Sequence, residues 1–92
     1  MEQVQLLIGD RDVAASKSAT FDRLNPISGE TASRAAAASV EDALAIAESA
    51  AKAFPKWAAI GPSERRAKLM KAAELLESRA QQFAALVLAE TG

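Results

Sequence analysis

The sequence predicts an α+β chain in which short β-hairpins precede three amphipathic helices. Three observations support this prediction. Apolar residues recur at every second position near the N-terminus, a turn-forming stretch, LNPISGE, occupies residues 24–30, and apolar residues recur every three or four positions after residue 39. We therefore expect strands and hairpin turns over residues 1–38 and a helical part over residues 39–92.

The first hairpin is predicted within VQLLIGDRDV, residues 4–13. Val4, Leu6 and Ile8 occupy alternate positions, as expected of a strand with one covered face. Gly9-Asp10 then supplies two residues that tolerate the unusual backbone angles of a tight hairpin turn.

A second pair of strands is predicted on either side of LNPISGE. Pro26 removes an amide donor, and Ser28-Gly29 favours a turn. The residues after this turn have no bulky apolar side chain, so that strand must be held by pairing. Together the strands predict a sheet of at most four strands.

The first helix is predicted to begin after Ser39, whose hydroxyl can cap free amides while Glu41-Asp42 favours the positive end of the helix. Pro55 cannot donate the next hydrogen bond and disfavours helical geometry at Phe54, so we expect the helix to end or kink there. The apolar stripe of this helix comprises Val40, Ala43, Leu44, Ala47, Ala51 and Phe54.

Two more helices are predicted beyond Gly61-Pro62. The second begins at Pro62 and carries a Glu64–Lys68 pair in the favourable i, i+4 order. The third follows SRAQ at 78–81, a candidate capping box. The inward face of the second helix is predicted to be Leu69, Ala72, Ala73 and Leu76, and that of the third Phe83, Leu86 and Val87.

Composition restricts the classes of function. The 92 residues carry 11 basic and 12 acidic side chains, for a net charge of −1, which gives no electrostatic reason to expect nucleic acid or an anionic membrane as partner. The N-terminus has an acid where a signal peptide needs a basic region, and its apolar run is too short for a membrane span. These features predict a cytoplasmic location.

Catalytic chemistry has few candidates, since the chain has no histidine and no cysteine. Glu41-Asp42 could act as an acid–base pair, but neighbouring helix residues face different directions, which favours a capping role. Glu64-Arg65-Arg66 could bind an anion, although a solvated helix start is the simpler interpretation. Trp57 could stack on a ligand, although a packing anchor is favoured. A small carboxylate-based enzyme is accordingly the least favoured alternative.

The order of several motifs resembles the N-terminal region of the NAD(P)-dependent aldehyde dehydrogenase superfamily. In that family an Asn-Pro-x-x-Gly-Glu turn joins two strands, a helix ends in Ala-Phe-x-x-Trp, and the next opens with Pro-x-x-Glu-Arg. The combination of WAAIGPSERR and LAETG looks most like members acting on aromatic aldehydes, such as salicylaldehyde, benzaldehyde or vanillin dehydrogenases. The matching residues are Asn25, Pro26, Gly29, Glu30, Ala53, Phe54, Trp57, Pro62, Glu64 and Arg65.

The resemblance implies a parent enzyme that oxidises an aldehyde to the carboxylic acid with NAD or NADP. In the family a cysteine thiolate attacks the aldehyde and hydride passes to the coenzyme. This chain has no cysteine, so the resemblance implies a scaffold segment that is inactive and binds no coenzyme alone. Its helices are expected in a doubly wound α/β coenzyme-binding domain, its partner is the rest of the parent chain, and the parent is expected to be a homodimer or homotetramer.

One site is implied by the resemblance. Some family members hold a monovalent cation with the backbone carbonyl before the Asn-Pro turn and with an acid before the final Thr-Gly or Asn-Gly. The matching positions are Leu24 and Glu90.

Two hypotheses follow. The first is the N-terminal segment of an aldehyde dehydrogenase, which predicts an exposed apolar face and leaves Trp57 and Ile60 with little local partner. The alternative is a self-standing, noncatalytic helical module that dimerises or binds a protein through its alanine-rich stripes. The alternative predicts cooperative unfolding and a defined oligomer.

Overall fold

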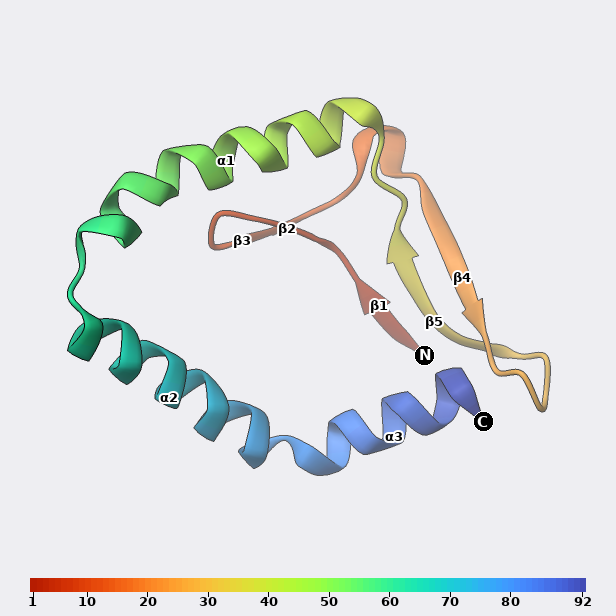
Figure 1. Ribbon diagram of the computed structural model, residues 1–92. Coiled ribbons are helices and arrows are strands. Elements are labelled where there is room, and N and C mark those ends of the chain that lie inside the picture. Colours follow the sequence, from red (N-terminus) through yellow and green to blue (C-terminus); the bar gives the residue numbers. More distant parts are fainter.

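The computed structural model describes all residues 1–92 and confirms an α+β chain with strands first and three helices after them (Figure 1). The strands are β1 (Glu2–Val4), β2 (Leu6–Ile8), β3 (Arg11–Val13), β4 (Thr20–Leu24) and β5 (Thr31–Ala36), with a single 3₁₀ turn, η1 (Ser16–Ser18), before β4. The helices are α1 (Val40–Ala59), α2 (Pro62–Ser78) and α3 (Ala80–Thr91).

The strands form two separate sheets. In the first, β5 lies between β1, which is parallel to it, and β4, which is antiparallel. In the second, β2 pairs with β3 around Gly9-Asp10, and Gly9 has the positive φ of 65° that such a turn requires. The predicted hairpins are thus confirmed. The prediction of one sheet of at most four strands is wrong, because residues 2–8 divide at Gln5 between two different pairing partners.

Helix α1 begins as predicted and ends later than predicted. Ser39 caps it in a reciprocal capping box with Asp42. The helix continues through Pro55 to Ala59, so of the two predicted outcomes, an end or a kink, the end at Phe54 is wrong. Proline removes one amide donor, and the exposed ring lies on the solvent side. The carbonyls of the last turn also gain a donor from Arg65, as described below.

Helices α2 and α3 are separated only by Arg79. Helix α2 begins at Pro62, as predicted. The predicted capping box at 78–81 is wrong. Ser78 is still the last residue of α2, and its hydroxyl donates to the carbonyl of Leu75 at 2.7 Å rather than capping α3. No side chain caps the start of α3.

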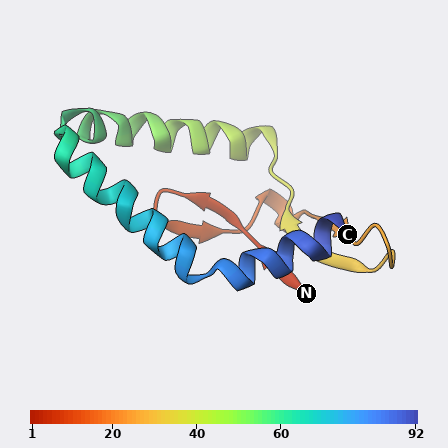
Figure 2. The ribbon, with the colours of Figure 1, turned by 60° about the horizontal axis from the view of Figure 1, so that its bottom comes forward.

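The molecule is open, because the helices follow one another around the strands instead of stacking (Figures 1 and 2). Its accessible surface is 7361 Å², whereas a compact monomer of its 9.6 kDa exposes about 5,100 Å². Its radius of gyration is 16.5 Å, against about 12 Å for a compact chain of this length. Only Ala15 and Ser33 are buried.

The predicted apolar stripes are therefore exposed. Leu44 is 66%, Phe54 65% and Leu69 63% exposed, so the helical stripes do not form a shared core within these residues. The expectation of an exposed apolar face is confirmed. None of the three helices is both long enough and apolar enough to cross a bilayer.

Candidate functional site

The turn at residues 25–30 owes its shape to the side chain of its first residue. The Asn25 side-chain oxygen accepts hydrogen bonds from the amides of Ile27 at 2.8 Å and Ser28 at 3.2 Å. Gly29 has φ of 78°, a conformation that side chains rarely adopt. The backbone amide of Asn25 donates to the carbonyl of Glu30 at 2.8 Å and closes the turn. The asparagine and glycine of the motif therefore serve turn geometry.

The C-terminal end of α3 lies against this turn and against β5. A Cβ built on Gly92 would lie 3.2 Å from the Ile27 side chain, so a larger residue would crowd the contact. Ser33, which is only 3% exposed, donates from its hydroxyl to Oε1 of Glu90 at 2.6 Å. This bond fastens the end of α3 to the central strand of the three-stranded sheet.

The structure brings the two predicted cation ligands to the same region of the fold. Ser33, which holds Glu90, pairs with Arg23 of β4. Leu24 follows Arg23, and the strand pairing is irregular between Arg23 and Leu24. Oε2 of Glu90 accepts no hydrogen bond. No group of three or more acidic, histidine or cysteine side chains gathers anywhere in the chain, so a cation here would depend on Glu90 and on main-chain carbonyls.

A second polar cluster joins η1 to the start of α1. The carboxylate of Asp42 accepts from the Ser16 amide at 2.9 Å, the Ser16 hydroxyl at 2.7 Å and the Ser39 amide at 2.9 Å. These bonds lower the pKa of Asp42 to about 2. The bond from the Ser39 amide has the largest effect, followed by the two bonds from Ser16. They also hold a segment in which Lys17 and Ser18 have the unfavourable φ angles of 60° and 53°.

The capping role is therefore confirmed for Asp42, which completes the capping box with Ser39, whereas the Glu41 side chain makes no hydrogen bond. The two serines that complete these clusters, Ser16 and Ser33, were not singled out from the sequence. Each pairs with an acid 26 or 57 residues further along the chain, and local patterns carry no signal for such contacts.

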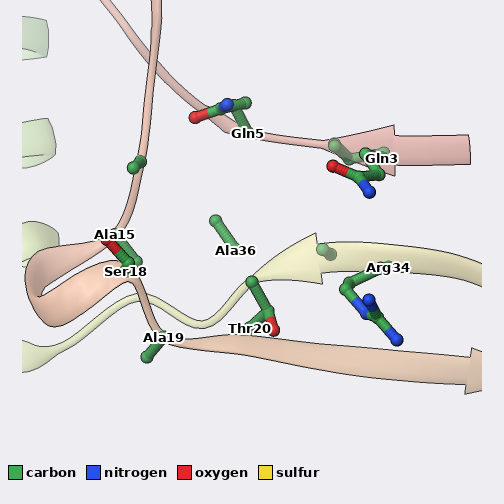
Figure 3. Close-up of a pocket in the computed structure, with 11 residues that line it drawn as sticks. Gln3, Gln5, Ala15, Ser18, Ala19, Thr20, Arg34 and Ala36 are labelled. Carbon is green, nitrogen blue, oxygen red and sulfur yellow. The ribbon is translucent and has the colours of Figure 1, made fainter.

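Strands β4 and β5 carry an ion pair beside a small cavity. Arg34 donates to Asp22 from Nε at 2.6 Å and from its terminal nitrogen at 3.2 Å. The bond from Arg34 lowers the pKa of Asp22, and the same bond raises the pKa of Arg34. Residues of β1, η1, β4 and β5 line a cavity of about 140 Å³ (Figure 3). Its labelled polar side chains, such as Gln3 and Ser18, do not form a catalytic group.

At the elbow between α1 and α2, Arg65 lies beside Trp57. Its guanidinium donates to the carbonyl of Ala58 at 3.0 Å and, more weakly, to that of Trp57 at 3.4 Å. The guanidinium carbon lies 5.8 Å from the centre of the Trp57 ring, within cation–π range. Arg65 therefore satisfies free backbone carbonyls at the C-terminal end of α1. This engagement argues against Glu64-Arg65-Arg66 as an anion site.

Comparison with known proteins decides the family. The model of the aldehyde dehydrogenase family matches residues 13–92. The chain belongs to the aldehyde dehydrogenase family. The matched residues include the turn at 25–30 and the junction between α1 and α2 that Arg65 holds.

Members of the family that are similar to this chain carry names of aromatic-aldehyde enzymes. The chain is 53% identical over 92 residues to a vanillin dehydrogenase of Pseudomonas sp. (strain HR199 / DSM 7063) and 37% identical over 90 residues to a salicylaldehyde dehydrogenase of Pseudomonas putida. In both cases it covers all or nearly all of its own length (100% and 98%) and 19% of the relative.

A solved structure shows the same fold. It is a salicylaldehyde dehydrogenase from Pseudomonas putida G7 complexed with salicylaldehyde, with a TM-score of 0.94 and 36% identity. The match covers 98% of this chain and 19% of that one. The strands and helices described above thus correspond to a part of an aldehyde dehydrogenase fold, and the chain spans about a fifth of the length of these relatives.

Proposed function

We propose that these residues form the N-terminal scaffold portion of an enzyme that oxidises an aromatic aldehyde to the carboxylic acid with NAD or NADP. The observation that carries the proposal is 53% identity over all 92 residues to a vanillin dehydrogenase. The parent is a cytoplasmic homodimer or homotetramer in this proposal. Residues 1–38 supply its first strands, and residues 39–92 are the helical part of its coenzyme-binding domain.

The contribution of the chain is structural. Neither a G-x-G-x-x-G nor a G-x-x-x-x-G-K-S/T loop occurs in it, and it has no cysteine, so this proposal places the coenzyme loop and the cysteine nucleophile in the rest of the parent. Exposed apolar side chains on all three helices provide a surface for the rest of the parent.

Coenzyme reduction tests this proposal. Protein produced from the full coding sequence is expected to reduce NAD⁺ or NADP⁺ with vanillin or salicylaldehyde, with kcat/KM about tenfold or more above that for hexanal. Residues 1–92 alone are expected to be inactive with every aldehyde. Equal rates with aromatic and aliphatic aldehydes would contradict the substrate class, and the absence of any aldehyde-dependent reduction would contradict the reaction.

We also propose that Glu90 and the Leu24 carbonyl hold a monovalent cation. In support of this, Oε2 of Glu90 is free while Oε1 is fixed by Ser33, so the carboxylate is oriented. Titration of the chain with Na⁺ is expected to broaden the sodium NMR line, and Glu90→Gln, which keeps an oxygen for Ser33, is expected to remove the broadening. Glu77→Gln, at the end of α2, serves as the control. Equal broadening in both variants would contradict the site.

A further inference from the structure

The elbow between α1 and α2 contains a pocket of about 340 Å³, at the lower end of the size range of ligand sites. The last two turns of α1 and the first two turns of α2 meet there on either side of Gly61 (Figure 1). Its lining residues are Lys52, Ala53, Lys56, Trp57, Ile60, Glu64 and Lys68. The lining therefore combines an apolar wall, formed by Ala53, Trp57 and Ile60, with four charged side chains, three of which are lysines.

The apolar wall is open to solvent but fixed in position. Trp57 is 42% exposed, and Ile60 beside it is half-buried. Arg65, which is not part of the lining, interacts with the Trp57 ring at 5.8 Å and donates to the backbone of the same turn. A ring held in this way loses little further freedom when a planar molecule stacks on it.

The charged rim has an excess of cations. Lys52 pairs with Glu48 at 3.3 Å, and Lys68 is only at the limit of an ion pair with Glu64, at 4.0 Å. Lys56 forms no ion pair. Of the four charged lining residues, three are lysines and one is an acid, so the pocket favours an anion.

We propose that the elbow pocket binds a small aromatic carboxylate, whose ring stacks on Trp57 while its carboxylate pairs with Lys56 and Lys52. An inorganic anion would leave the wall of Trp57 and Ile60 unused, and a neutral aromatic would leave the lysines unused. The site is separate from the chemistry of the proposed reaction. It is assigned from these residues alone, so its failure would leave the proposed function untouched.

The test uses protein produced from the full coding sequence, and the part of its tryptophan fluorescence that is lost in Trp57→Phe reports on this pocket. Benzoate is the probe. We expect saturable quenching or a saturable spectral shift with benzoate, little change with benzyl alcohol or acetate at equal concentration, and weaker binding as salt is added. Lys56→Gln is expected to raise the apparent Kd about two- to fivefold, and Lys52→Gln/Lys56→Gln further.

Lys71→Gln, on α2 but outside the lining, is the matched control and is expected to leave the Kd unchanged. Far-UV circular dichroism of each variant verifies that its helix content is kept. A linear, unsaturable response to benzoate would overturn the proposal. An equal response to benzyl alcohol, or the same Kd in Lys56→Gln and Lys71→Gln, would overturn it as well.

Discussion

The isolated 92 residues are expected to bind the dye ANS strongly and to lose structure over a broad range of temperature rather than in one sharp transition. The reason is the surface, which exceeds that of a compact monomer of the same mass by roughly 2,000 Å². That excess is comparable to a complete protein–protein interface. With only Ala15 and Ser33 buried, little tertiary packing is available to make the unfolding cooperative.

Differential scanning calorimetry and ANS fluorescence check this expectation, with a compact monomeric domain of similar mass as the control. Sedimentation at several concentrations shows whether the exposed faces associate. A single two-state transition with calorimetric and van't Hoff enthalpies in agreement, together with one defined oligomer and no ANS binding, would contradict it. That result would favour the self-standing helical module.

Asp42→Asn is expected to release η1 from α1 and to lower the helix content at the start of α1. The carboxylate accepts three hydrogen bonds with its two oxygens, and asparagine replaces one of these oxygens with a donor group. Ser39→Ala removes the capping bond from the Asp42 amide and the longer bond that the Ser39 hydroxyl donates to the Ser16 hydroxyl at 3.3 Å. It is expected to cost about 1 kcal/mol of helix stability, and Asp42→Asn more than that. Glu41→Gln is the matched control, because Glu41 makes no hydrogen bond.

Acid should produce the same release. The pKa of Asp42 is about 2 in the folded chain and 3.8 without the fold, so the folded state prefers the ionised carboxylate. Its contribution to stability is complete above about pH 4 and is lost as the pH falls towards 2. Carboxyl NMR titration measures the midpoint, and amide exchange at Ser16 measures the release. A midpoint near 3.8 with unchanged exchange at Ser16 in Asp42→Asn would contradict the described role.

Local patterns predicted local structure well. The turn at Gly9-Asp10, the turn at 25–30 and the start of α1 each depend on residues within a few positions of one another, and each was predicted. Pro55 shows where such patterns fail. The sequence indicated an end or a kink there, but α1 continues to Ala59. Its last carbonyls, those of Trp57 and Ala58, accept hydrogen bonds from Arg65, which belongs to the next helix.

Contacts between residues far apart in the chain could not be predicted from local sequence patterns. Ser16 with Asp42 and Ser33 with Glu90 lie 26 and 57 positions apart, and only the folded chain brings them together. The division of the strands into two sheets has the same origin, because β1 pairs with β5 rather than with its neighbour in sequence. The residues alone predicted no reaction, and the expected chemistry came only from the resemblance to the family.

The exposed surface and the family membership support one account, in which these residues are a scaffold completed by the rest of an aldehyde dehydrogenase. The chain covers 19% of the relatives that it matches, and its apolar faces remain uncovered within these residues. Both facts follow if the remaining part of the protein packs on α1, α2 and α3.

Reading the coding sequence beyond the codon for Gly92 tests this account most directly. The account predicts an uninterrupted reading frame that encodes a glycine-containing coenzyme loop and, further on, a cysteine nucleophile. A stop codon directly after Gly92 in the intact gene would contradict it.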